Sequence, residues 1–213
     1  MAVLDLEEQE QLAAFKAWWH DNRTWLVGTL LVSAVVVGGW RGWHYYQNKQ
    51  ANDSAILYAE FVKQVETNGD TKRMNDAAAA VMDKYPASAY ASRAALLVAQ
   101  FNEQDKNAEK AKTQLQWVID HSSEAGLKDV ASLRLVAILL DEKKYDEASK
   151  LLDAKHQKSF DGLYADLKGD VLSAQGKVEE AKTSYKLAYE KMDTKSAYRN
   201  LIQMKMDALG TTK

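Results

Sequence analysis

The sequence predicts an all-α protein, in which a single transmembrane helix near the N-terminus precedes a right-handed solenoid of helix pairs. Three observations predict this fold. One stretch of the chain is long, apolar and free of charge, and only 1 of the 213 residues is proline. Pairs of amphipathic segments then follow one another to the C-terminus. Because β-branched residues rarely cluster outside the apolar stretch and alanine is abundant, the composition is typical of helical proteins.

The apolar stretch covers residues 24–40, TWLVGTLLVSAVVVGGW, with Arg23 before it and Arg41 after it. As a helix, it would rise about 26 Å, close to the thickness of the hydrocarbon core of a bilayer. Amphipathic aromatic rings settle at the level of lipid headgroups, and such rings lie near both ends. We therefore predict a transmembrane helix over residues 24–46, with a membrane interface formed by Trp18, Trp19, Trp25, Trp40, Trp43 and Tyr45.

Two other interpretations of this stretch remain open. One is a buried helix of a soluble protein, although such helices usually carry a polar face and this stretch has only Thr and Ser. The other is a cleaved signal peptide, which begins with a short basic region. An uncleaved anchor fits better, because the preceding segment is long and acidic, with Asp5, Glu7, Glu8, Glu10 and Asp21 against Lys16 and Arg23.

Residues 1–23 form an acidic amphipathic segment, in which Leu12, Phe15, Trp18 and Trp19 recur at helical spacing. We predict a short helix near the membrane surface, with Asp21 and Asn22 capping the helix that follows. A poorly ordered tail is the alternative. Residues 47–53 are predicted to be a linker, and residues 54–213 a helical domain that ends in a capping helix.

Beyond the linker, amphipathic segments alternate with short polar turns. Tyr85 and Pro86 end the first pair of helices, because proline cannot continue a helix. A single amphipathic helix, residues 196–209, is predicted to close the chain before Gly210. The four predicted pairs are residues 54–65 with 77–82, residues 89–101 with 108–120, residues 130–140 with 146–153, and residues 164–174 with 179–191.

The helix pairs repeat at a period that is typical of helical solenoids. Residues 176–181, GKVEEA, match residues 143–148, KKYDEA, at a distance of 33 positions. In each copy a short turn precedes an alanine, Ala181 or Ala148, that lets the paired helices approach closely. Both copies resemble the turn and second helix of a tetratricopeptide repeat, and Gly169 falls at its small first-helix position. A generic helical bundle is the alternative.

The chain offers few groups for catalysis or metal binding. It has no cysteine, so thiolate ligands and disulfides are excluded. His20, His44, His121 and His156 have no partners at a metal-ligand spacing, and no phosphate-binding loop or nucleophile motif occurs. A net charge of −2 gives no basic field for nucleic acid. We therefore predict a protein without enzymatic activity, cofactor or nucleic-acid partner, which binds other polypeptides.

In a solenoid of this kind, the first helix of each pair lines a groove that receives a polypeptide. Repeat proteins that bind C-terminal carboxylates carry Lys and Asn there, whereas this chain has Leu96, Leu133 and Ala137. We therefore expect a helix or an unfolded segment as the ligand. The alternative is that the two leucines belong to the core. The predicted partner-binding groove contains Arg93, Leu96, Gln100, Leu133, Ala137, Asp166 and Asp170.

Three stretches resemble the ancillary SecYEG translocon subunit family, the YfgM type. The resemblance spans nearly the whole chain. The first stretch is residues 11–19, QLAAFKAWW, which lead through Asp21 and Asn22 into the apolar stretch. The others are residues 165–170, ADLKGD, with Gly176 and Lys177 after them, and residues 204–209, MKMDAL.

The resemblance implies a single-pass protein of the bacterial inner membrane, with a cytoplasmic N-terminus and a periplasmic helical domain. It implies as partners the SecYEG translocon, a PpiD-like periplasmic chaperone, client polypeptides and membrane lipid, and a role in handing emerging proteins to chaperones. The sequence itself leaves the orientation open, because Lys16 and Arg23 balance Arg41 and Lys49. A membrane-tethered cytoplasmic tetratricopeptide adaptor or regulator is the alternative.

Overall fold

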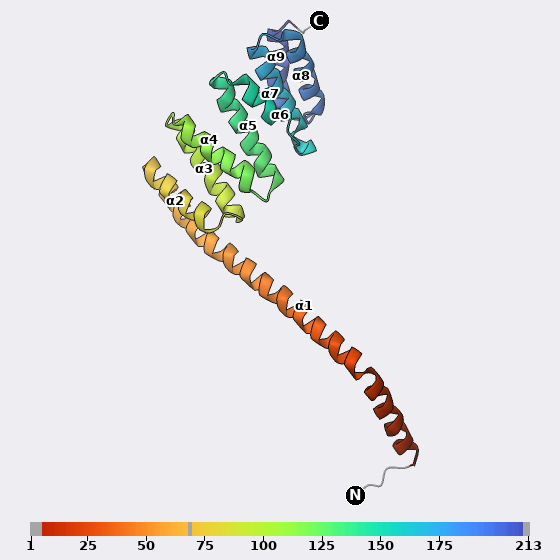
Figure 1. Cartoon of the computed structure of the whole chain (residues 1–213). Helices are drawn as coiled ribbons and strands as arrows, with labels where there is room; N and C mark the ends of the chain where they lie inside the picture. The colour runs from red at the N-terminus through yellow and green to blue at the C-terminus, as the bar shows by residue number, and fades with distance from the viewer. Residues whose placement is uncertain (1–5, 68–69, 211–213) are drawn as a thin grey trace. The chain divides into compact units, whose positions relative to one another are not determined.

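The structure is a computed structural model that describes residues 6–67 and 70–210. All regular elements within these residues are helices, which confirms the predicted all-α class. The chain divides into two compact units, Met1–Gln50 and Ala51–Lys213. Helix α1 (Leu6–Glu66) begins in the first unit and ends in the second, and the second unit contains the stacked helices of Figure 1.

Helix α1 is continuous through residues that the sequence analysis divides among a leader helix, a transmembrane helix, a linker and a first solenoid helix. The helix start expected at Asp21 and Asn22 is wrong, because both residues lie inside α1. There the side chain of Asn22 donates to the carbonyl oxygen of Trp18 at 2.8 Å. No proline interrupts α1, so nothing in its sequence forces a break. The boundaries at residues 1–23, 24–46, 47–53 and 54–213 stay a prediction.

The second unit continues as a series of short helices joined by tight connections. Helix α2 begins six residues earlier than predicted, α5 five residues earlier and α7 three residues earlier, whereas the other ends of these short helices agree to within three residues. A short 3-10 helix, η1, was not predicted. The elements are α2 (Thr71–Lys84), α3 (Ala89–Gln104), α4 (Ala108–His121), α5 (Ala125–Asp141), α6 (Tyr145–Leu152), η1 (Lys158–Phe160), α7 (Asp161–Ala174), α8 (Val178–Lys191) and α9 (Tyr198–Ala208).

The same turn joins three of the helix pairs. Lys106, Lys143 and Gly176 adopt positive φ angles of 60°, 59° and 75°. A residue in this left-handed conformation commonly ends an α-helix, since it lets the following amides bond to the last free carbonyls. The predicted turns are therefore confirmed in all three pairs. The amides that follow donate to the first helix: Asn107 N to Asn102 O at 2.7 Å, Lys144 N to Leu139 O at 2.8 Å, and Lys177 N to Leu172 O at 2.9 Å.

Small residues bring the paired helices close together. Ala111, Ala148 and Ala181, which follow the three turns at the same distance, are each 0% exposed. A Cβ atom added to Gly169 of α7 would lie only 2.5 Å from Cδ1 of Tyr185 on α8. Tyr185 is itself buried, and its hydroxyl donates to Asp170 at 2.8 Å, so its ring cannot easily move away.

The core of the second unit is a series of clusters, each shared by consecutive helices. Phe61 of α1 packs in one cluster with α2 and α3, and Leu115 of α4 lies in a second with α3, α5, α6 and α7. The third cluster joins α7 and α8 to Ile202 of α9. A stack of helix pairs has this type of core, because no pair can bury its apolar face alone.

The contact between Gly169 and Tyr185 predicts that Gly169→Ala destabilises the protein. We expect the free energy of unfolding to fall by about 1–3 kcal/mol, because overpacking outweighs a helix-propensity gain of about 0.5–1 kcal/mol. The measurement is thermal unfolding followed by circular dichroism. Gly126→Ala in α5 is the matched control, since its Cβ would lie 3.6 Å from the nearest heavy atom, Oε1 of Gln157. Equal melting temperatures for the two variants would contradict the close approach.

Candidate functional site

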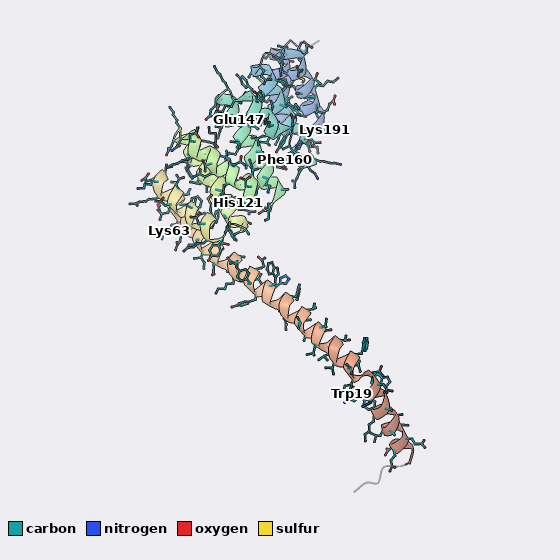
Figure 2. All side chains as sticks on the ribbon, in the orientation of Figure 1. Trp19, Lys63, His121, Glu147, Phe160 and Lys191 are labelled. Carbon is teal, nitrogen blue, oxygen red and sulfur yellow. The ribbon has the colours of Figure 1, made fainter. Side chains whose placement is uncertain are left out.

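The apolar part of α1 is uncovered in the structure. One candidate membrane span lies within α1, and its apolar window is 0% buried by the rest of the described chain. A core helix of a soluble protein is mostly buried, so this exposure favours a helix surrounded by lipid. Figure 2 labels Trp19, which lies on α1 shortly before this apolar part. All six aromatic residues predicted at the membrane interface are exposed: Trp18, Trp19, Trp25, Trp40, Trp43 and Tyr45.

The spacing of these aromatic side chains along α1 suits a bilayer. At 1.5 Å per residue, Trp25 and Trp40 lie about 22 Å apart along the helix axis, and Trp19 and Trp43 about 36 Å. The hydrocarbon core is about 30 Å thick, and the headgroup regions extend it to about 40–45 Å. The aromatic residues therefore bracket the edges of a hydrocarbon layer, although their contact with lipid stays a prediction.

Helix α3 presents three of the predicted groove residues. Gln100 is exposed, whereas Leu96 is half-buried and packs against the central core cluster. Arg93 forms a two-pronged ion pair with Glu124, from Nη1 to Oε1 at 2.7 Å and from Nη2 to Oε2 at 3.1 Å. This pair ties α3 to the start of α5, and the bond to Glu124 raises the pKa of Arg93.

Helix α5 lies beside α3 and contributes the next two predicted groove residues. Arg134 joins the helices by donating to the carbonyl oxygen of Leu96 at 2.9 Å and to Glu103 at 3.0 Å. Leu133 is half-buried against the core, and Ala137 is exposed at the edge of a hollow of about 290 Å³. The structure thus brings Gln100 and Ala137 onto adjacent first helices, while both leucines are largely packing residues.

The two acidic residues predicted for the groove lie in a different environment. Asp166 is 0% exposed, and its Oδ2 accepts from the hydroxyl of Tyr198 at 2.9 Å and from Nζ of Lys205 at 2.8 Å. Oδ2 of Asp170 also accepts from Lys205, at 2.8 Å. Burial, followed by the negative charge of Asp166, raises the pKa of Tyr198. Both carboxylates therefore bind α9 rather than facing an open groove.

A second hollow, of about 770 Å³, was missed by the sequence analysis. It lies between α4 and α6 over α5, and Figure 2 labels two of its lining residues, His121 on α4 and Glu147 on α6. The sequence signal for this hollow is Trp117. This large residue lies on the second helix of its pair, at a position other than the one equivalent to the buried alanines. The apolar lining is Trp117, Leu135, Leu139 and Leu151, and the charged lining includes Glu109, Lys112, Asp120, Lys144, Glu147 and Lys150.

Three charged side chains of this second hollow, Glu109, Lys112 and Lys144, form ion pairs within the chain. Lys112 contacts Glu109 and Glu142, each at 2.7 Å, and these bonds raise its pKa. Lys112 and then Lys144 lower the pKa of Glu142. The hollow therefore presents an apolar floor with a rim whose charges largely neutralise each other.

The histidines of the second unit take part in packing. His156 stacks on Tyr164 with ring centroids 3.8 Å apart, and His121 stacks on Trp117 at 4.6 Å. Burial raises the pKa of Tyr164 to about 12. Within residues 6–67 and 70–210, no three His, Asp or Glu side chains are grouped so that they could hold a metal ion.

Comparison with known proteins places this arrangement in a family. The family profile described as a tetratricopeptide repeat-like domain matches residues 16–211. A relative from Neisseria gonorrhoeae, the ancillary SecYEG translocon subunit, is 33% identical over 96% of this chain and 98% of its own length. The ancillary SecYEG translocon subunit of Escherichia coli is 28% identical over 95% of this chain and 96% of its own length. No solved structure matches the chain significantly.

These matches confirm the resemblance found in the sequence and the tetratricopeptide-like nature of the helix stack. They also confirm the prediction of a non-enzymatic protein, since the family consists of ancillary translocon subunits. The match to the relatives includes both the apolar part of α1 and the second unit, so neither is peculiar to this chain. The chain belongs to the ancillary SecYEG translocon subunit family.

Proposed function

We propose that this protein is an ancillary subunit of the SecYEG translocon, anchored in the bacterial inner membrane by α1. Its helical unit faces the periplasm, binds a PpiD-like chaperone and assists the handover of translocated polypeptides. The observation that carries the proposal is similarity over 96% of the chain to a relative named as an ancillary SecYEG translocon subunit. The candidate membrane span within α1 and the stack of helix pairs support the same role.

The apolar part of α1 supports a role inside the membrane, beside the translocon. A helix that is apolar and uncovered over its central part is stable in lipid, where all of its backbone groups bond internally. Small residues, Ala34 and Gly38, lie one turn apart, and the added Cβ of Gly38 would meet no heavy atom within 4 Å. Such small residues permit close packing against another membrane helix. We place the translocon contact on this part of α1.

The helical unit supports a role in binding polypeptides. Gln100 and Ala137 are exposed on the adjacent first helices α3 and α5, where solenoids commonly receive a ligand. The hollow at Ala137 is small, so it fits side chains of a docked segment better than a compact small molecule. We assign the chaperone or client contact to this surface, here termed the first-helix surface.

The proposed orientation can be tested by cysteine labelling, because the natural chain contains no cysteine. We expect Lys186→Cys, at an exposed position of α8, to react with a membrane-impermeant maleimide in spheroplasts. Glu10→Cys, ahead of the membrane span, should react only after the cells are lysed. The opposite labelling pattern would place the helical unit in the cytoplasm and favour the adaptor function.

The first-helix surface can be distinguished from the second hollow by photo-crosslinking. Gln100 on α3 and Gln116 on α4 are both exposed glutamines, which makes them a matched pair of positions. A photo-reactive residue at position 100 should crosslink to a periplasmic chaperone or a client in intact membranes, with little product from position 116. Strong crosslinks from position 116 and none from position 100 would move the binding site to the hollow between α4 and α6.

A further inference from the structure

The acidic pair of α7, Asp166 and Asp170, is already occupied by the last helix of the same chain. Lys205 of α9 bridges the two carboxylates of α7, with its Nζ 2.8 Å from Asp166 Oδ2 and 2.8 Å from Asp170 Oδ2. Tyr198, two turns earlier on α9, donates to the same oxygen of Asp166. Helix α9 therefore holds one cationic and one phenolic side chain against an acidic pair.

This acidic pair is not fully satisfied by α9. Asp166 is completely buried, and its Oδ1 has no hydrogen-bond partner among the described residues. Both carboxylates share the one ammonium group of Lys205. A buried carboxylate oxygen without a donor is unfavourable. Oδ1 of Asp166 can therefore accept a hydrogen bond from a further donor, which Lys205 does not supply.

Helix α9 is also weakly embedded in the stack. Ile202 is its one buried residue, whereas α7 buries seven residues and α8 buries three. Its outer side is mixed, with Leu201 41% exposed and Met204 67% exposed beside the exposed polar residues Asn200 and Asp207. A terminal helix that only seals a solenoid is expected to carry a polar outer face. The exposure of Leu201 and Met204 departs from that expectation.

We propose that Asp166 and Asp170 form a receptor for a cationic side chain on an amphipathic helix, and that α9 is its exchangeable occupant. A partner helix with Arg or Lys at the place of Lys205 displaces α9 and binds α7 and α8. Arginine suits the site better than lysine, because its planar guanidinium offers five donors and can pair with both oxygens of a carboxylate. The inference rests on the proposed polypeptide-binding function and adds the chemistry of the ligand and a means of regulating access.

The test uses the full-length protein in detergent micelles and a fluorescent peptide of residues 195–210, KSAYRNLIQMKMDALG, with anisotropy as the readout. Two further peptides carry Lys205→Arg or Lys205→Met. The chains compared are the natural one, Lys205→Met, which frees the acidic pair, and Lys186→Met, a control at an exposed lysine of α8.

We expect the natural peptide to bind the Lys205→Met chain about tenfold more tightly than it binds the natural chain or the Lys186→Met chain. The Arg peptide should bind more tightly than the natural peptide. The Met peptide should bind about tenfold more weakly than the natural peptide, because hydrogen bonds between charged groups are stronger than those between neutral groups. Equal affinity of the three peptides would overturn the cation site. Absence of binding to a folded Lys205→Met chain would show that α9 is a fixed cap.

If the Lys205→Met chain does not fold, hydrogen exchange on the natural chain tests the displacement of α9 instead. Excess Arg peptide should increase amide exchange over residues 198–208 and leave the exchange of α3 unchanged. No increase over residues 198–208 at saturating peptide would contradict exchange of α9. Crosslinking from position 100 does not require α9 to move. If this inference alone fails, position 100 still crosslinks to a chaperone or client, whereas failure of the proposed function abolishes that crosslink.

Discussion

Close approach of the paired helices at small residues is the constraint on which the second unit depends. Gly169 faces the ring of Tyr185, and the alanines at equivalent positions after the three turns, one of them in the same helix pair, are fully buried. Two helices this close bury the apolar side chains between them. Each pair still has another apolar face, which it can bury only by stacking on the next pair. Stacking in turn sets the first helices side by side, as the contacts of Arg134 with Leu96 and Glu103 show for α3 and α5. The surface proposed for partner binding is a consequence of that packing.

Much of the fold could be predicted because it follows local rules. The turn before Ala181 can be read from Gly176, which adopts the left-handed conformation that glycine favours. The same turn before Ala148 contains Lys143, so the prediction there depended on the match between the two copies. The apolar stretch of α1 was identified from composition alone, since seventeen uncharged residues have few stable locations outside lipid. Helix continuity through residues 47–53 was missed, because a polar stretch without proline gives no signal for or against a helix.

The candidate site could be predicted only in part. Gln100 and Ala137 lie on adjacent first helices as expected, since the repeat register determines which side of each helix they occupy. Asp166 and Asp170 were expected in an open groove, yet they contact Tyr198 and Lys205 of α9. Such contacts between residues more than 30 positions apart depend on how the last helix docks, which no local pattern encodes. The hollow beside Trp117 was missed for the same reason, because three helices form it together.

The proposed function requires the membrane helix of this chain to contact the translocon, and crosslinking within the bilayer detects such a contact. A photo-reactive residue would be placed at Ala34, beside the small residue Gly38, or at Val36 on another side of α1, in the full-length protein in native membranes. We expect crosslinks from position 34 to a subunit of SecYEG and weaker ones from position 36. Absence of SecYEG crosslinks from both positions, while both proteins are present in the membrane, would contradict this contact.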